Sequence, residues 1–217
     1  MPGSFCFRAF AASLIHTCIF VLAPVILWRV LYGTGFSIGK ETTKNMDPLA
    51  TDIELLRQIR QLLTGNQQTV AVAESVTAGH LQVMLSLAEK AMDFFQGGIT
   101  TYNIGQKTKH LNIDPIHAQT CDCVSEKVAL EMSIAVGPLF SADWGIAITG
   151  YASPVPELGI TELFAYYAFS FKGQPVGQGI LRADNNGDPV AVRLYYTHEL
   201  LLLFKEALHL PYSPAKK

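Results

Sequence analysis

The stretch Thr69-Val70-Ala71-Val72-Ala73-Glu74-Ser75-Val76-Thr77-Ala78-Gly79 decides the fold of this 217-residue chain. Its first five residues form the apolar, β-branched run of a buried strand, and the apolar spacing after it indicates a helix. Ser75 therefore stands at a strand-to-helix turn. A helix start offers unpaired N–H groups and a partial positive charge, which stabilise an oxyanion or bind a phosphate. Both roles stay open for Thr77, Ala78 and Gly79, as does a simple N-cap role for Ser75 or Thr77.

A second segment, Gly97-Gly98-Ile99-Thr100-Thr101-Tyr102-Asn103-Ile104-Gly105-Gln106-Lys107, predicts a short strand that ends at Tyr102 and a helix that begins before Lys107. Desolvation at an apolar sheet edge lowers the pKa of a lysine. A neutral amine of this kind can accept the proton of a serine, as Ser–Lys pairs do. The alternative is that Lys107 is an ordinary solvated surface lysine.

Strands and helices alternate along the chain. Strands are predicted at 69–73, 99–102, 145–149, 163–171 and 176–181, and helices at 52–63, 77–88, 104–111, 125–140 and 189–207. This alternation is typical of a three-layer α/β/α domain. The short connection at 172–175 makes the last two strands antiparallel, so we expect a mixed sheet of about five strands. Ligands bind beyond the carboxyl ends of parallel strands, where Ser75, Tyr102 and Gly150 stand.

Composition excludes several classes of function. The net charge is −2 and no basic stripe is present, which argues against a nucleic-acid partner. The four cysteines, two of them in the first 18 residues, define no disulfide framework. Cys121 and Cys123 have His110 and His117 nearby, but they lack the ligand spacing and the closed ligand set of a zinc site. We expect reduced cysteines in a cytosolic protein and no bound metal.

The N-terminal segment needs a separate interpretation. Residues 9–28 contain no Asp, Glu, Lys or Arg and are long enough to span a bilayer, but they include Pro24 and no clean small-residue cleavage site. Residues 1–45 are then either an inner-membrane anchor or sequence upstream of a true start at Met46. We predict the second, with a cytoplasmic domain at 46–217 that opens on an amphipathic helix. A membrane contact is expected only if the anchor is real.

Six motifs follow one another in the order and approximate spacing of one known family. They are Ala73-Glu74-Ser75-x-Thr77-x-Gly79, Gly97-Gly98-x-x-x-Tyr102, Lys107, Val124-Ser125-Glu126, Thr149-Gly150-x-Ala152-x-Pro154 and Gly187-Asp188-x-x-x-Val192-Arg193. In these motifs the chain resembles the nicotinamide-nucleotide amidohydrolase family, whose domain also forms the C-terminal half of competence/damage-inducible protein A, CinA. The resemblance covers about residues 52 to 208.

The resemblance implies an activity and a set of site residues. The family hydrolyses the carboxamide of nicotinamide mononucleotide to nicotinic acid mononucleotide and ammonia, without a cofactor or required metal, and a homodimer is expected. Ser75 would be the nucleophile, Lys107 the base and Tyr102 the assisting tyrosine. Thr149 and Gly150 would line the substrate site. Arg193 would contact the phosphate, the alternative being a surface charge on the last helix.

Four departures from the family pattern set a rival reading beside this one. Ala78 replaces a glycine of the first motif, residues 103–106 replace the usual polar neighbours of the lysine, and Pro189 replaces an arginine. The fourth lies in the loop Gly150-Tyr151-Ala152-Ser153-Pro154-Val155-Pro156-Glu157, which is bulkier and stiffer than the glycine-rich loop of the family. The rival is a non-catalytic homologue that binds a nucleotide or a protein partner.

Overall fold

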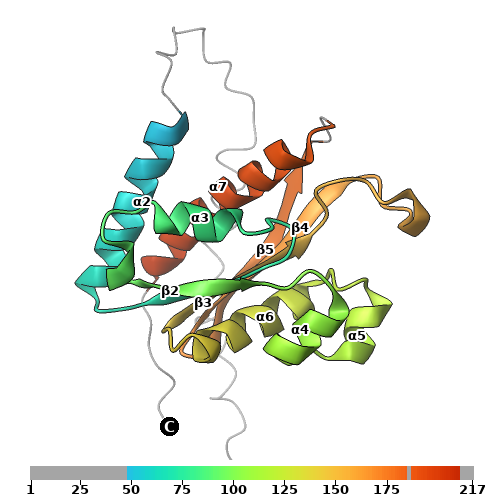
Figure 1. The fold of residues 1–217 in the computed structure, drawn as a ribbon, viewed down its shortest axis with the longest axis horizontal. Helices are drawn as coiled ribbons and strands as arrows, with labels where there is room; N and C mark the ends of the chain where they lie inside the picture. Colours follow the sequence, from blue (N-terminus) through green and yellow to red (C-terminus); the bar gives the residue numbers. More distant parts are fainter. Residues whose placement is uncertain (1–47, 185–186, 211–217) are drawn as a thin grey trace, which may run out of the picture. The chain divides into compact units, whose positions relative to one another are not determined.

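A computed structural model describes residues 48–184 and 187–210, which form a five-stranded sheet with helices on both faces (Figure 1). The expected anchor at 9–28 and the expected start at Met46 lie outside the described residues. Within the described residues, every helix is too short or too polar to cross a bilayer.

The sheet is mixed, as predicted, and its strand order is β2-β1-β3-β4-β5. The strands are β1 (Val70–Glu74), β2 (Phe95–Thr100), β3 (Trp144–Gly150), β4 (Leu163–Phe171) and β5 (Gln174–Ala183). Strand β1 lies between β2 and β3 and runs parallel to both. The pairs β3–β4 and β4–β5 are antiparallel. The carboxyl ends of β1, β2 and β3 therefore meet at one edge of the sheet.

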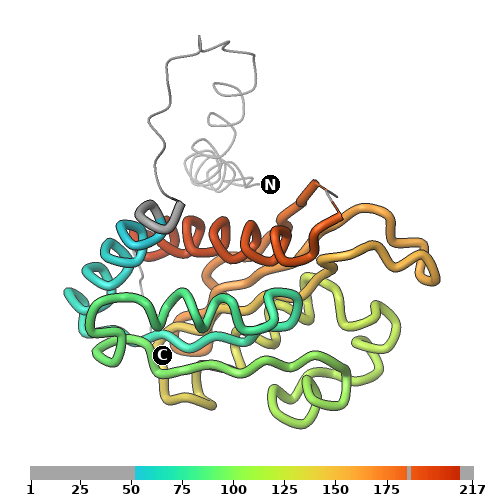
Figure 2. Tube along the Cα trace, turned by 45° about the horizontal axis from the view of Figure 1, so that its top comes forward, coloured from blue at the N-terminus to red at the C-terminus, as the bar shows by residue number. Residues whose placement is uncertain are grey.

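Three helices cover each face of the sheet (Figure 1). One face carries α2 (Pro48–Gly65), α3 (His80–Ser86) and α7 (Pro189–Leu208). The other carries α4 (Ile104–Leu111), α5 (Pro115–Thr120) and α6 (Glu126–Leu139). Helices α2 and α7 lie side by side (Figure 2), where His198 Nδ1 is 2.7 Å from Asp52 Oδ1. Short 3₁₀ turns occupy Ala91–Asp93 and Pro156–Leu158.

Alternation along β1 builds the two halves of the core. Val70 and Val72 pack in the cluster that includes α2, α3 and α7, whereas Ala71 and Ala73 pack in the cluster that includes α4 and α6. All five residues of β1 are buried, because helices cover both faces of the strand. The strand that leads into Ser75 is thus held by packing from both sides.

Several predicted boundaries were wrong, and one helix was not predicted. Helix α2 begins at Pro48 rather than at residue 52, and β5 extends two residues further at each end than predicted. Strand β2 spans Phe95–Thr100 rather than 99–102. Gly97 and Gly98 weaken the strand signal, although a Cβ at Gly98 would collide with Val72 of the neighbouring strand. Helix α3 begins at His80 rather than at Thr77. The six-residue α5 is too short to show a helical period in the sequence.

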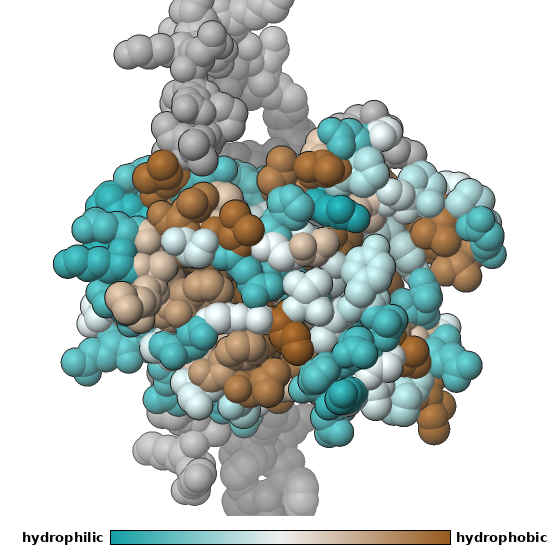
Figure 3. Space-filling model, viewed as in Figure 1, coloured by the Kyte–Doolittle hydropathy of each residue, from teal (hydrophilic) through white to brown (hydrophobic). Residues whose placement is uncertain are grey.

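Apolar side chains gather on the surface over α3 (Figure 3), where Val83 and Leu87 are 58% and 52% exposed. Neither residue lines the cavity at the carboxyl edge of the sheet. The candidate site and this apolar surface are therefore separate features of the molecule.

Candidate active site

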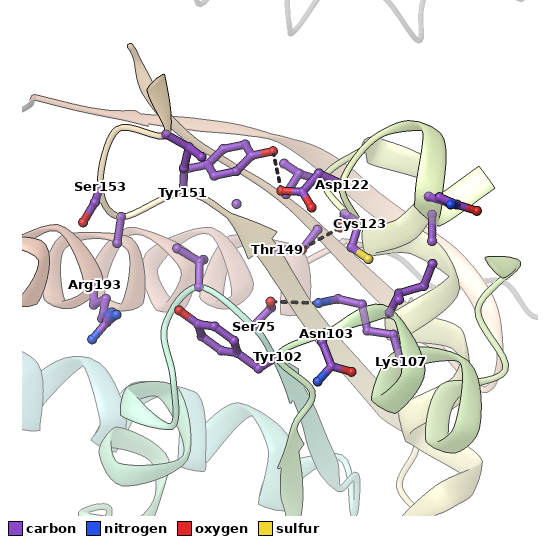
Figure 4. Close-up of a pocket in the computed structure, with 18 residues that line it drawn as sticks. Ser75, Tyr102, Asn103, Lys107, Asp122, Cys123, Thr149, Tyr151, Ser153 and Arg193 are labelled. Carbon is purple, nitrogen blue, oxygen red and sulfur yellow. Dashed lines mark hydrogen bonds between the residues drawn. The ribbon is translucent and has the colours of Figure 1, made fainter. Parts of the chain in front are cut away.

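A cavity of about 500 Å³ opens at the carboxyl ends of β1, β2 and β3 (Figure 4). Six of the residues predicted from the sequence line it: Ser75, Tyr102, Lys107, Thr149, Gly150 and Arg193. These residues come from five segments of the chain, and the parallel strand ends bring them together as expected for this class of sheet.

Ser75 and Lys107 are in direct contact at the base of the cavity. Lys107 Nζ lies 2.9 Å from Ser75 Oγ and 2.9 Å from the backbone oxygen of Thr101. Lys107 is 1% exposed and Ser75 is 7% exposed. Within the described part of the chain, no carboxylate forms an ion pair with Lys107. The reading of Lys107 as a solvated surface residue does not fit this geometry.

Helix α4 positions Lys107 beside Ser75. The Asn103 side chain caps the helix by accepting a hydrogen bond from the Gln106 N–H, so Lys107 falls in the first turn. Lys107 and Leu111, four residues apart, are the two buried residues of the helix. The polar neighbours expected from the family are missing here, yet the spacing from Tyr102 to Lys107 keeps the amine on the inner face.

Burial governs the charge of this amine. Desolvation lowers the pKa of Lys107 from its ordinary value, because the low-dielectric interior disfavours the ammonium form. The nearby Cys123 and Asp122 act in the opposite direction and raise it. Desolvation also raises the pKa of the Cys123 thiol, which favours its neutral form. The larger effect on Lys107 favours the neutral amine that a general base requires.

A carboxylate that the sequence analysis did not single out accepts the hydrogen bonds of the backbone N–H groups at the start of α3. Glu74, the last residue of β1, is fully buried, and its oxygens accept hydrogen bonds from Thr77 Oγ1 and from three backbone N–H groups. Those N–H groups belong to Gly79, Leu81 and Gln82, at 2.9 to 3.0 Å. The donors and partial charge of the helix start are thus already matched inside the protein.

This arrangement corrects the expected anion site at Thr77, Ala78 and Gly79, none of which lines the cavity. The Gly79 N–H donates to Glu74, and the Ala78 N–H donates to the Ser75 carbonyl at 3.2 Å. Val76, directly after the serine, does line the cavity, and its backbone N–H has no hydrogen-bond acceptor among the described residues. This group is the donor that remains for an oxyanion. A charged residue that ends a buried strand was the signal for Glu74.

Thr149 and Gly150 line the cavity for structural reasons visible in the fold. Thr149 Oγ1 is buried and donates to the Cys123 carbonyl at 2.8 Å, which ties the loop before α6 to the end of β3. A Cβ at Gly150 would collide with the backbone of Phe164 and Ala165 in β4. Glycine is therefore required by close strand packing at this position.

Tyr102 and Arg193 lie on the open side of the cavity. Tyr102 is 69% exposed, and in the view of Figure 4 its hydroxyl points away from Lys107. Arg193 reaches the cavity from α7, and its buried Nε has no hydrogen-bond partner among the described residues. A buried donor without an acceptor is rare in folded proteins and suits a group that waits for an anionic ligand.

Tyr151 and Asp122 also line the cavity, and sequence reasoning assigned no role to either residue. The Tyr151 hydroxyl donates to Asp122 Oδ2 at 3.2 Å (Figure 4). Burial and the Asp122 carboxylate together raise the pKa of Tyr151 to about 12, so the phenol stays protonated. The bulkier loop at 150–157 is therefore tied to the loop before α6.

The chain is similar to known proteins over most of its described part. The family model of the CinA C-terminal domain matches residues 52–162. A CinA-like protein of Synechocystis is 43% identical over 93 residues, which are 43% of this chain and 22% of that protein. One from Picosynechococcus is 34% identical over 125 residues, which are 51% of this chain and 30% of that protein. The matched segments thus span less than a third of these longer relatives.

Solved structures share the fold. The CinA superfamily protein of Klebsiella pneumoniae 700603 is 28% identical with a TM-score of 0.65, covering 72% of this chain and 97% of its own. The corresponding protein of Escherichia coli is also 28% identical with a TM-score of 0.65, covering 81% and 100%. Since the family model matches half of the chain and the folds agree, this chain belongs to the CinA C-terminal domain family.

Proposed function

We propose that this domain is an amidohydrolase that removes ammonia from the carboxamide of nicotinamide mononucleotide through Ser75 and Lys107. The observation that carries the proposal is the 2.9 Å contact between Lys107 Nζ and Ser75 Oγ at the base of a cavity that also contains Arg193. The substrate and the roles of the residues come from the resemblance to the nicotinamide-nucleotide amidohydrolases. A purely ligand-binding homologue would not need a buried amine against the serine.

In the first step, Ser75 Oγ attacks the carboxamide carbon while the neutral amine of Lys107 accepts the hydroxyl proton. One Nζ–H remains bound to the Thr101 carbonyl, which orients the nitrogen lone pair toward the serine. The N–H group of Val76 stabilises the negative oxygen of the tetrahedral intermediate. Stabilisation of the oxyanion was expected from the start of the helix, and we propose it instead for the turn before α3.

In the second step, the C–N bond breaks, and Lys107 returns its proton to the leaving nitrogen, which departs as ammonia. Water then attacks the acyl-enzyme and gives a proton to Lys107. Collapse of the second intermediate releases the carboxylic acid and restores the Ser75 hydroxyl. Tyr102 stays a prediction in this scheme, and its exposed position in the cavity wall suits contact with the substrate.

Arg193 is the candidate for the phosphate. Its buried Nε has no partner within residues 48–184 and 187–210, and the helix start that was the rival candidate binds the Glu74 carboxylate. The substrate phosphate would accept charge-assisted hydrogen bonds from the guanidinium group. Of the two phosphate sites that the sequence left open, we therefore favour the one on α7.

Ammonia release from nicotinamide mononucleotide by the purified protein tests the proposal. We expect Ser75→Ala and Lys107→Ala each to remove most of the turnover, and the double variant to lose little more, because the two residues act as a unit. Circular dichroism establishes that the variants fold. A folded Ser75→Ala protein with wild-type turnover would contradict the assignment of the nucleophile.

A further inference from the structure

The cavity carries opposite charges on different sides of the Ser75–Lys107 pair. Arg193 enters it from α7, and Asp122 enters it from the loop between α5 and α6 (Figure 4). The proposed reaction uses Arg193 and leaves Asp122 without a role. A carboxylate in the wall of a site that binds an anionic nucleotide repels that ligand unless the ligand also carries a positive charge.

The position of Asp122 is fixed by the fold around it. Asp122 and Cys123 both have left-handed backbone conformations, with φ of 48° and 61°. The Cys123 N–H donates to the Ala118 carbonyl at 2.7 Å, and the Cys123 carbonyl accepts from Thr149 Oγ1 at 2.8 Å. These two hydrogen bonds hold the Cys123 backbone on both sides and so fix the loop that carries Asp122.

Tyr151 is held as firmly on the opposite loop. Its N–H donates to the Phe164 carbonyl at 2.9 Å, and its own carbonyl accepts from the Tyr196 hydroxyl at 3.2 Å. Its ring packs edge-on against Phe164, with centroids 5.5 Å apart. The hydroxyl reaches Asp122 at 3.2 Å, so the aromatic ring and the carboxylate form one unit in the cavity wall.

We propose that Asp122 and Tyr151 form a subsite that recognises a cationic aromatic ring, and that this subsite selects pyridinium amides over amides on neutral rings. The inference rests on the proposed function, because the carboxamide at Ser75 places the ring that bears it in the same cavity. An aromatic face beside a carboxylate is the chemistry that binds delocalised cations. Arg193 would then face the phosphate of the ligand and Asp122 its pyridinium ring, so that each charge of a zwitterionic ligand meets an opposite charge.

Two probes isolate the charge of the ring. Nicotinamide mononucleotide has a pyridinium ring, and its reduced form has the same carboxamide, ribose and phosphate on a neutral dihydropyridine. We would measure the binding of both by calorimetry to the full-length Ser75→Ala protein, in which turnover does not interfere. Three second substitutions are then compared in that background: Asp122→Asn, Tyr151→Phe and Glu162→Gln.

Each substitution separates one cause from another. Asn keeps a hydrogen-bond acceptor for Tyr151 and tolerates the left-handed backbone, so Asp122→Asn removes mainly the charge. Phe keeps the ring but releases the Asp122 carboxylate from its hydrogen bond. Glu162 is an exposed carboxylate outside the cavity, paired with Arg182, and Glu162→Gln changes the net charge by the same amount.

We expect the Ser75→Ala protein to prefer the pyridinium nucleotide, and Asp122→Asn to reduce that preference by about three- to tenfold, the range for one partly screened contact to a cation. Tyr151→Phe should reduce it less, and Glu162→Gln should leave it unchanged. Equal losses for both probes, an unchanged preference in Asp122→Asn, or binding of neither probe would each overturn the inference.

Ammonia release by the protein with Ser75 intact is read separately from binding. Release without an Asp122-dependent preference would leave the proposed function standing and reject the cation subsite. An Asp122-dependent preference without ammonia release would support the subsite and reject the catalytic proposal.

Discussion

Two buried ionisable groups lie beside Ser75, and they differ in how completely the protein satisfies their hydrogen-bonding capacity. Glu74 accepts four hydrogen bonds from the turn and from the start of α3. Lys107 has only two acceptors in the described structure, and one of them is Ser75, the proposed nucleophile. A saturated buried charge fixes the backbone, whereas an under-satisfied one changes its protonation state readily. We therefore infer a structural role for Glu74 and propose a catalytic role for Lys107.

The largest expected effect comes from Lys107→Met, which breaks the chemical side of the comparison. We expect turnover to fall by about a thousandfold or more, because the serine loses its base. The free energy of unfolding should be unchanged or higher, because an apolar side chain of similar length replaces a poorly satisfied buried amine. Steady-state ammonia release and urea denaturation measure the two quantities. A strong loss of stability would mean that Lys107 is structural as well.

The substitution Glu74→Gln tests the structural role of Glu74. Glutamine has one acceptor oxygen, and its amide group would face backbone donors, so we expect a loss of about 3 kcal/mol in the free energy of unfolding. Urea denaturation measures it from the midpoint and slope. Glu54→Gln is the matched control, since Glu54 forms an exposed pair with Arg57 and its loss should hardly move the midpoint. Wild-type stability in Glu74→Gln would show that the four hydrogen bonds carry little net energy.

These two variants bear on what the sequence alone predicts. The strands β1, β3 and β4 were placed within a residue or two, because continuous apolar runs leave little choice of period. Ser75 and Lys107 were found from the residues and the resemblance together. Glu74 was missed, because its four donors lie three to eight residues further along a turn whose path the sequence does not specify. Asp122 was missed because a left-handed aspartate has no sequence pattern.

Arg193→Ala extends the comparison to a half-buried side chain whose Nε has no hydrogen-bond partner among the described residues. We expect it to weaken kcat/KM for nicotinamide mononucleotide by about ten- to a hundredfold, the loss of one charge-assisted contact of roughly 1.5 to 3 kcal/mol. The riboside, which lacks the phosphate, should be nearly unaffected. Equal losses on both substrates would make Arg193 structural, in the manner of Glu74.

The smallest expected effect is a shift in the pH dependence of activity, which tests the proposed role of Lys107. Because burial lowers the pKa of Lys107, activity should rise with pH as the ammonium of the folded protein loses its proton. Removing the Asp122 charge by Asp122→Asn removes an influence that raises this pKa, so the rise should move to lower pH. The pH dependence of kcat/KM, measured for both proteins in the same buffers, records this shift. An unchanged profile would mean that the Asp122 charge has no effect on the pKa of Lys107.

The same lowered pKa also affects stability with a definite sign. Between the folded pKa of Lys107 and the unfolded value of 10.5, the unfolded chain binds one more proton than the folded protein. The contribution of Lys107 to the free energy of unfolding therefore increases as pH rises through that window. Lys107→Met should lack this increase, which urea denaturation at several pH values can detect.

The position of β1 between β2 and β3 has a consequence for folding during synthesis. Val70 pairs with Trp144 in β3, so the strand before Ser75 gains its second neighbour only after some seventy further residues have left the ribosome. Until then one edge of an apolar strand stays open, and non-local pairings of this kind form slowly. Arg193 follows later still. The nascent chain therefore contains Ser75 long before the cavity around it is complete, so a partly synthesised chain should lack the proposed activity.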